Sequence, residues 1–324
     1  MMTTLPPQTD LSAWLQGRID TGSVLPETAR TILGLARASV AVAALASQNG
    51  LGPAALGDVT GGENADGDNQ KALDVMADQL IEQAPQDTGL HAYLSEEREE
   101  AVILSADAEL VCACDPLDGS SNIDTNLTIG TIFSVYPRAG DSLLRPGRDQ
   151  LAAGFFAYGP QTALMLTCGD GTFAFCLDDA GTYRLMDWRA DIPPRTSEFA
   201  INAANQRHWT PQTSAYISQL LAGQTGARGR NFNMRWAGSL VAECWRIVRR
   251  GGIFLYPQDA RTGYETGRLR LVYEANPVSF VIEQAGGRAT DGTRAIMDIQ
   301  PSALHQRVPF IFGSAEEVDW YKTI

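Results

Sequence analysis

The chain has 324 residues, and its 25 lysines and arginines are outnumbered by 38 aspartates and glutamates, which gives a net charge of −13. This charge argues against nucleic acid or an anionic membrane surface as a partner, so an anionic substrate would have to be met by local basic residues. A single hydrophobic core stops growing near this length, and we expect two α/β domains, residues 1–194 and 195–324.

No segment has the pattern of a targeting signal or a membrane anchor. The amino terminus lacks a basic start and an apolar core, and the apolar run 40–46 is too short to span a bilayer. The five cysteines lack metal-site spacing, and Cys112 and Cys114 would share one face of a strand. We therefore expect a cytoplasmic protein with reduced structural thiols.

The first half of the chain predicts helices before strands. Apolar residues recur at helical spacing over 32–43 and again over 73–80, which indicates two amphipathic helices. The segment between them, 49–69, is rich in Gly, Asp and Asn, and a structureless connector of that length is either disordered or functional. A short strand is predicted over 90–94.

Two glutamates, Glu96 and Glu97, follow that predicted strand. Adjacent side chains at a strand end point to opposite sides, so one could bridge metal ions while the other holds a water. Taken alone, the pair also has the pattern of a solvated charge cluster, because further charged residues follow it.

The segment Asp115-Pro-Leu-Asp-Gly-Ser-Ser-Asn-Ile-Asp124 places two carboxylates three residues apart. Mg²⁺ prefers oxygen ligands and usually takes one or two carboxylates together with substrate phosphate oxygens, which suits Asp115 and Asp118. Pro116 removes a backbone donor, so the carbonyl of Leu117 could face the same cation. The small residues that follow could bind an anion through amides and hydroxyls: Gly119, Ser120 and Ser121. In isolation the segment is equally a good turn.

From residue 110 to 177 the pattern changes to short β-rich runs separated by turn residues, which predicts an antiparallel or mixed sheet. Residues 191–195 have the composition of a boundary between the two halves of the chain. Beyond it, predicted strands alternate with helical segments, which favours two layered α/β halves. These later strands are 199–202, 253–256, 269–273 and 310–313.

The pattern alone leaves the roles of five charged residues open. Glu274 ends a predicted strand just before a helix start at Asn276-Pro277, where a carboxylate faces a cleft as often as solvent. Arg268 and Arg270 share a strand face, which suits a phosphate but also an ordinary solvated surface. Asp68 could simply cap the next helix, and Asp74 lies one position off its apolar stripe.

Together with Ser95-Glu96-Glu97, the motifs Gly251-Gly-Ile-Phe-Leu-Tyr-Pro257 and Arg268-Leu-Arg-Leu-Val-Tyr-Glu-Ala-Asn-Pro277 resemble those of the class 1 fructose-1,6-bisphosphatases. The Asp-Pro-Leu-Asp-Gly core is shared with the wider family of Mg²⁺-dependent, lithium-sensitive phosphatases, whereas the later motifs are specific. The resemblance covers nearly the whole chain. It implies a five-layered α-β-α-β-α sandwich with the active site between the halves.

The resemblance also implies a reaction and a set of roles. The reaction is hydrolysis of the 1-phosphate of fructose 1,6-bisphosphate to fructose 6-phosphate, in gluconeogenesis or the Calvin cycle, by a homotetramer with two or three Mg²⁺ ions per subunit that Mn²⁺ can replace. The implied metal ligands are Asp68, Glu96, Asp115, the Leu117 carbonyl, Asp118 and Glu274. The implied water-activating pair is Asp74 and Glu97. The implied substrate-binding residues are Gly119, Ser120, Ser121, Asn202, Tyr256, Arg268 and, from a neighbouring subunit, Arg235.

Three departures from the family pattern bear on the substrate. Residues 201–205 read Ile-Asn-Ala-Ala-Asn where Asn-Glu-Gly is commoner, Trp236 follows Arg235 where tyrosine is usual, and Arg268 replaces a frequent lysine. Arginine is the better bidentate phosphate ligand, whereas tryptophan lacks the phenol oxygen. A sedoheptulose-1,7-bisphosphatase, an inositol or nucleotide monophosphate phosphatase and a non-catalytic sugar-phosphate sensor therefore remain as alternatives.

AMP-inhibited members bind the nucleotide with a lysine-tyrosine pair and with an arginine after a tyrosine. This chain has Glu109 and Leu110 at the first two positions, and Pro137 follows Tyr136 with Arg138 one place late. A glutamate repels the AMP phosphate and a leucine cannot hydrogen-bond it. We therefore expect an enzyme that AMP does not inhibit.

Overall fold

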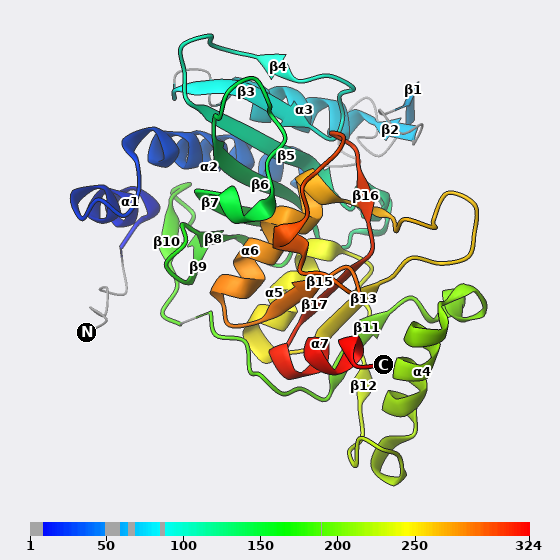
Figure 1. Cartoon of the computed structure of the whole chain (residues 1–324). Helices are drawn as coiled ribbons and strands as arrows, with labels where there is room; N and C mark the ends of the chain where they lie inside the picture. Colours follow the sequence, from blue (N-terminus) through cyan, green and yellow to red (C-terminus); the bar gives the residue numbers. More distant parts are fainter. Residues whose placement is uncertain (1–8, 49–58, 64–68, 85–87, 189) are drawn as a thin grey trace.

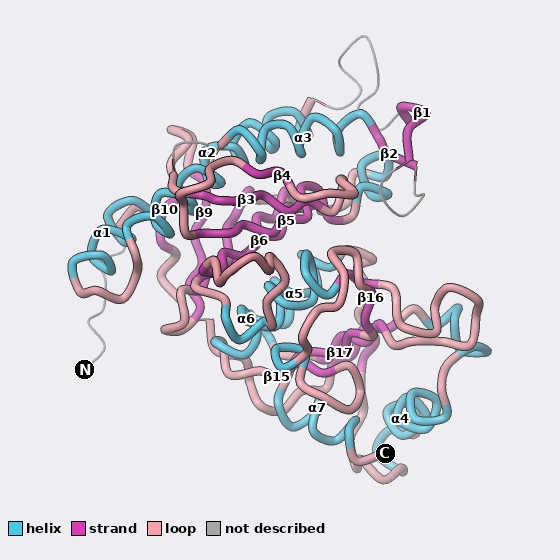
Figure 2. The backbone as a smooth tube through the Cα atoms, turned by 45° about the horizontal axis from the view of Figure 1, so that its top comes forward, coloured by secondary structure: helices cyan, strands magenta, loops and turns pink. Residues whose placement is uncertain are grey.

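The computed structural model describes residues 9–48, 59–63, 69–84, 88–188 and 190–324. Helices and sheets alternate in five layers, α-β-α-β-α (Figure 1), so the fold implied by the family resemblance is confirmed. In the tube view the three helical layers are separated by the two sheets, with α5 and α6 in the middle (Figure 2).

The first helical layer contains α1 (Leu11–Asp20), α2 (Pro26–Ser47) and α3 (Ala72–Gln83), which confirms both predicted amphipathic helices. Asp10 caps α1 by accepting a 2.8 Å hydrogen bond from the Ala13 amide. The short strands β1 (Val59–Glu63) and β2 (Asn69–Lys71) pair just before α3.

Helix α2 is, within the described ranges, the helix that is long and apolar enough to cross a membrane by length and composition. Half of its most apolar window is buried inside the protein, where it packs on the first sheet. A core helix meets the same two criteria, so this property does not indicate a membrane span.

The first sheet is mixed and has eight strands in the order β10-β9-β8-β7-β6-β5-β3-β4, with β3 and β5 parallel and the other neighbours antiparallel. This confirms the sheet predicted over 110–177. Its strands are β3 (Leu90–Ser95), β4 (Val102–Ile103), β5 (Leu110–Asp118), β6 (Ile129–Pro137), β7 (Ala152–Tyr158), β8 (Thr162–Thr167), β9 (Thr172–Leu177) and β10 (Tyr183–Leu185).

The middle layer, α5 (Leu240–Arg250) and α6 (Asn276–Gln284), separates this sheet from a five-stranded one. The second sheet has the order β12-β11-β13-β17-β15, and α4 (Pro211–Leu221) and α7 (Ala315–Lys322) cover its outer face. Its strands are β11 (Glu198–Ile201), β12 (Asn233–Met234), β13 (Ile253–Tyr256), β15 (Arg288–Thr290) and β17 (Phe310–Gly313). Beside it, β14 (Leu269–Arg270) pairs with β16 (Arg307–Val308).

The predicted strand 269–273 is wrong beyond Arg270. Residues Leu271–Ala275 form a π-helical turn, η5, that runs directly into α6. The amide of Arg270 donates to a carboxylate oxygen of Glu274, so the side chain of Glu274 closes the turn from inside. A π-turn of this kind is common at functional sites and has no apolar periodicity by which the sequence could reveal it.

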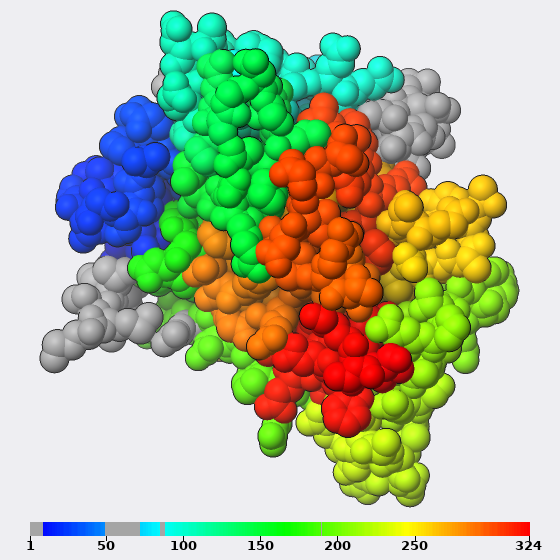
Figure 3. All heavy atoms as spheres, viewed as in Figure 1, coloured from blue at the N-terminus to red at the C-terminus, as the bar shows by residue number. Residues whose placement is uncertain are grey.

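A long connector of residues 257–268 leaves the carboxyl end of β13, the central strand of the second sheet, and leads to β14. In the space-filling view it is the gold protrusion beside the green surface of α4 (Figure 3).

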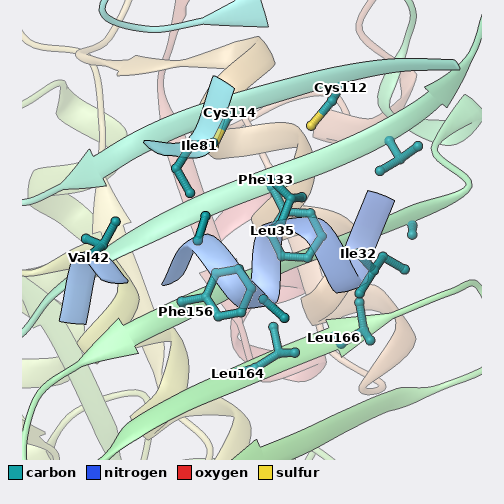
Figure 4. Close-up of a cluster of buried hydrophobic side chains, with 14 of the residues drawn as sticks. Ile32, Leu35, Val42, Ile81, Cys112, Cys114, Phe133, Phe156, Leu164 and Leu166 are labelled. Carbon is teal, nitrogen blue, oxygen red and sulfur yellow. The ribbon is translucent and has the colours of Figure 1, made fainter. Parts of the chain in front are cut away.

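The core follows from strand alternation in the first sheet. Phe133 and Phe156 face the α2 side, where they pack against Ile32 and Leu35 (Figure 4), whereas Ile132 and other alternate residues face the middle helices. All five cysteines are free, and Cys112 and Cys114 lie on the α2 face together, as predicted. The middle layer therefore contacts a sheet on each side. Residues from both halves of the chain can meet at one site there.

Candidate active site

An irregularity in β5 brings two aspartates to one side of the first sheet. Asp115 lies opposite Ile132 and Asp118 opposite Gly130, so three steps along β5 match two steps along β6. In a regular strand, residues three apart would point to opposite faces, and one extra residue reverses that outcome. Pro116, which cannot donate to the ladder, occupies this bulge.

Hydrogen bonds hold the bulge in place. The Leu117 amide donates to Asp115 Oδ1 (3.0 Å), and the Thr131 hydroxyl donates to the Pro116 carbonyl (2.8 Å). The Val241 amide, in the first turn of α5, donates to Asp118 Oδ2 (3.2 Å). Asp118 therefore links the first sheet to the positive end of a middle-layer helix.

Asp115, Asp118 and Glu274 meet in a buried group that we call the acidic cluster. One carboxylate oxygen from each residue lies within 4.8 Å of the others, and all three residues are buried. Two of these carboxylates come from β5 and the third from the π-turn before α6. Carboxylate oxygens at this spacing are the ligand set that a hard divalent cation prefers.

Burial and mutual repulsion raise the pKa values of these carboxyl groups. Burial raises the pKa of Asp118 to about 6, and burial together with the charge of Asp118 raises that of Glu274 to about 8. Burial, followed by repulsion from Glu96, raises the pKa of Asp115 well above its usual range. A divalent cation bound among these carboxylates would offset their repulsion and let all of them ionise.

Glu96 adds a fourth carboxylate to this region. Burial and then repulsion by Glu274 raise the pKa of Glu96. Its backbone amide donates to the Cys114 carbonyl (3.1 Å), and the Arg270 guanidinium lies 3.6 Å from its Oε1. Arg270 is only 3% exposed and thus faces the carboxylates rather than a phosphate site. The neighbouring Glu97 amide donates to Ser95 Oγ (3.2 Å).

The small residues after Asp118 form the predicted turn. Gly119 has φ 79°, a left-handed conformation that favours glycine, and caps the short 3-10 helix η1 (Ser120–Thr125). Backbone amides in a first helical turn lack helical acceptors, so those of Ser120 and Ser121 are suited to an anion. The Asn122 side chain donates to the Gly238 carbonyl (2.9 Å), which ties the turn to the segment before α5.

Of the two aspartates predicted before and within the second helix, Asp68 and Asp74, the structure describes one. Asp74 is buried in the first turn of α3, the helix that packs beside β5. Asp68 lies outside the described residues, so its role stays a prediction.

Three of the predicted substrate residues line one polar pocket in the second half. Asn202, Tyr256 and Arg268 surround it together with Asn205, Trp209 and Asp259. Asn202 caps the 3-10 helix η3 (Ala203–His208) by accepting from the Ala204 amide (3.1 Å). The last three lining residues are not among the site residues that the sequence predicts, where Asn205 stands out only as a departure from the family pattern.

Tyr256 connects this pocket to the acidic cluster. Burial raises the pKa of its phenol, the nearby charge of Arg268 lowers it, and the charge of Glu274 raises it. The phenol therefore lies within electrostatic range of Arg268 at the pocket and of Glu274 in the acidic cluster.

Arg235 does not join this pocket within one chain. Its amide donates to the Phe199 carbonyl (2.7 Å), and its half-exposed guanidinium lies 3.7 Å from Glu198 Oε1. Trp236 stacks on Phe254 with ring centroids 5.7 Å apart, so the indole replaces a phenol by packing rather than by hydrogen bonding.

Comparison with known proteins gives a consistent result along the chain. The model of the fructose-1-6-bisphosphatase N-terminal domain matches residues 32–187, and that of the C-terminal domain matches residues 192–324. The class 1 fructose-1,6-bisphosphatase of Paracoccus denitrificans is 56% identical over 261 residues, 79% of each chain. A class 1 fructose-1,6-bisphosphatase of Nitrobacter hamburgensis is 51% identical over 311 residues, 94% of this chain and 90% of that protein.

A solved structure agrees with these relatives. The holo form of Leishmania major fructose-1,6-bisphosphatase superposes with a TM-score of 0.89 at 30% identity, covering 98% of this chain and 99% of that one.

Proposed function

We propose that this chain, which belongs to the fructose-1,6-bisphosphatase family, hydrolyses fructose 1,6-bisphosphate to fructose 6-phosphate and phosphate. The observation that carries this proposal is the pairing of the buried acidic cluster with the polar pocket through Tyr256. A bisphosphorylated sugar offers one phosphate to each site.

The family is metal-dependent, and the acidic cluster is a fitting site because its carboxylates raise one another's pKa values. We propose Mg²⁺, two or three ions per subunit, with Mn²⁺ able to replace it. When bound, the metal would polarise the phosphoryl group and lower the pKa of a bound water. The residues that would hold it are Glu96, Asp115, the Leu117 carbonyl, Asp118, Glu274 and, for a third ion, Asp68.

Side chains and backbone amides of the protein would activate the water and bind the phosphoryl group. Asp74 and Glu97 would orient the attacking water and take its proton, as a general base does. The amides of Gly119, Ser120 and Ser121 would hold the oxygens of the transferring phosphoryl group as charge redistributes on them.

The polar pocket would hold the phosphate that is not cleaved. In this proposal Asn202, Tyr256 and Arg268 bind it from one chain, and Arg235 reaches it from a neighbouring subunit of a homotetramer. The exposed position of Arg235 away from its own pocket supports that arrangement. The same proposal places the enzyme in the cytoplasm, in gluconeogenesis or the Calvin cycle.

Phosphate release from a substrate panel tests this function. Fructose 1,6-bisphosphate, sedoheptulose 1,7-bisphosphate, inositol 1-phosphate and a nucleoside monophosphate should each be assayed with and without Mg²⁺. We expect fructose 1,6-bisphosphate to have the highest kcat/KM, with no turnover in chelator. A preference for a monophosphate would contradict the proposal, and binding of the bisphosphate without turnover would identify a sensor.

A further inference from the structure

The connector between β13 and β14, residues 257–268, is an ordered loop that we call the Arg268 loop. The Asp259 amide donates to the Tyr264 carbonyl and the Gly267 amide does the same, both at 3.1 Å. The Ala260 amide donates to the His208 carbonyl (3.1 Å), which fixes the loop to the end of η3. Gly267 has φ 92°, and a Cβ there would lie 2.2 Å from the Pro309 nitrogen, so the loop packs against the end of β16 where only glycine fits.

One arginine in this loop is neutralised. The Asp259 carboxylate, nearly buried, accepts hydrogen bonds from the amide and from Nε of Arg261, each at 3.0 Å. The Arg261 guanidinium holds the pKa of Asp259 below its usual range. Asp259 is therefore occupied and does not compete for other cations that border the pocket.

The guanidinium charge of the second arginine, Arg268, is not neutralised in this way. The guanidinium carbon of Arg268 lies 4.2 Å from the ring centroid of Tyr264 and 5.5 Å from that of Tyr256. In the part of the chain that the structure describes, Arg268 has no carboxylate partner. The Tyr264 ring also contacts Arg261, at 4.8 Å, and neutralisation of Arg261 by Asp259 allows both guanidiniums to share one ring.

We propose that Tyr264 is a positioning residue that sets the affinity of the polar pocket for the distal phosphate. Its ring holds the Arg268 guanidinium at the pocket by a cation–π contact, so the cation is pre-organised without a carboxylate that would neutralise it. A flexible arginine would otherwise lose side-chain entropy when it binds the phosphate. This inference rests on the proposed function, because it assigns the pocket to the uncleaved phosphate.

The test compares Tyr264→Leu with Tyr264→Phe, which keeps the ring. Calorimetric titration with fructose 6-phosphate, which carries only the distal phosphate, measures the pocket directly. Because a cation–π contact at a partly exposed site is modest, we expect Tyr264→Leu to weaken this binding by about threefold to tenfold, and Tyr264→Phe to match wild type. KM for the bisphosphate should rise by the same factor, while kcat stays within about twofold.

A double-mutant cycle with Arg268→Met separates positioning from a general structural role. In that background Tyr264→Leu should have no further effect on fructose 6-phosphate binding, since the cation it holds is gone. Additive losses, or a lower kcat with unchanged KM, would overturn the proposal. Tyr264→Gln serves as the second ring-free variant if the leucine variant fails to fold. An inactive wild-type enzyme would contradict the proposed function instead, and the binding assay would still report on Tyr264.

Discussion

The acidic cluster and the Arg268 loop handle charge in opposite ways. Asp115, Asp118 and Glu274 are buried with like-charged neighbours. Arg268 is a partly exposed cation that rests on aromatic rings. Like charges in a buried site destabilise one another until a counter-ion arrives, whereas an arginine on a ring face is stable by itself.

The two ends of the site therefore depend on a ligand to different degrees. The acidic end would need a cation to ionise fully, and changes there should affect chemistry by orders of magnitude. The basic end already holds its own cation, Arg268, in place in the free chain, so changes there should affect affinity by modest factors.

The largest effect should come from Asp118→Asn. This change keeps the shape and can still accept from the Val241 amide, but it removes one charge from the metal site, so we expect kcat to fall by at least about a thousandfold at saturating Mg²⁺. Phosphate release measures it, with the exposed Asp107→Asn as the matched control. Near-normal turnover would remove Asp118 from the proposed ligands.

Arg235→Ala should impair binding at the basic end, and its effect should be smaller than that of Asp118→Asn. Losing a charged hydrogen bond to the uncleaved phosphate should raise KM for the bisphosphate about tenfold and leave a monophosphorylated sugar unaffected. Mixing this variant with Asp118→Asn and allowing subunits to exchange should restore low KM, because the intact metal site then borrows Arg235 from its neighbour. Failure to complement in a proven hybrid oligomer would place Arg235 in its own subunit's chemistry.

Mg²⁺ should stabilise the protein more at pH 8 than at pH 6. The folded pKa values of Asp118 and Glu274, about 6 and about 8, lie above their ordinary values, so the folded state binds more protons. Stability of the metal-free protein is therefore lost as pH rises through that window, and a cation offsets the loss. Thermal unfolding with Mg²⁺ and with chelator measures the difference in Tm, and an equal rise at both pH values would contradict the assignment.

The smallest effect should be that of AMP, which we expect to leave the rate unchanged at concentrations that inhibit regulated family members. Besides Glu109 and Leu110, the structure shows that Arg138 Nη1 donates to the Ala106 carbonyl (2.6 Å) and is already engaged. Initial rates against AMP test this. Inhibition at micromolar AMP, non-competitive with the bisphosphate, would mean that the chain has rebuilt a nucleotide site.

The sequence predicted those elements whose apolar residues are periodic. Helices α2 and α3 and the strands β3, β13 and β17 follow the spacing of their buried side chains, which is why their existence could be read directly. The strand predicted through Tyr273 failed because the carboxylate of Glu274 closes a π-turn there, an interaction that no periodicity encodes.

The site was predicted unevenly for the same reason. Motifs named Asp115, Asp118 and Glu274, but nothing in the spacing of the first two showed that a bulge would turn them to one face. Tyr264 was missed because it lies in a loop, where its contact with Arg268 depends on tertiary position rather than on a pattern.

The bulge in β5 allows Asp115 and Asp118 to lie on one face of the sheet although they are three residues apart. Deletion of a single residue between Asp115 and Asp118 would remove the bulge and leave two steps along β5 against two along β6, which keeps both carboxylates on one face but changes the distance between them along the strand. Loops elsewhere in the molecule can change length without such a consequence. The length of this stretch is thus constrained as closely as its carboxylates, and a family alignment should show no gap between Asp115 and Asp118.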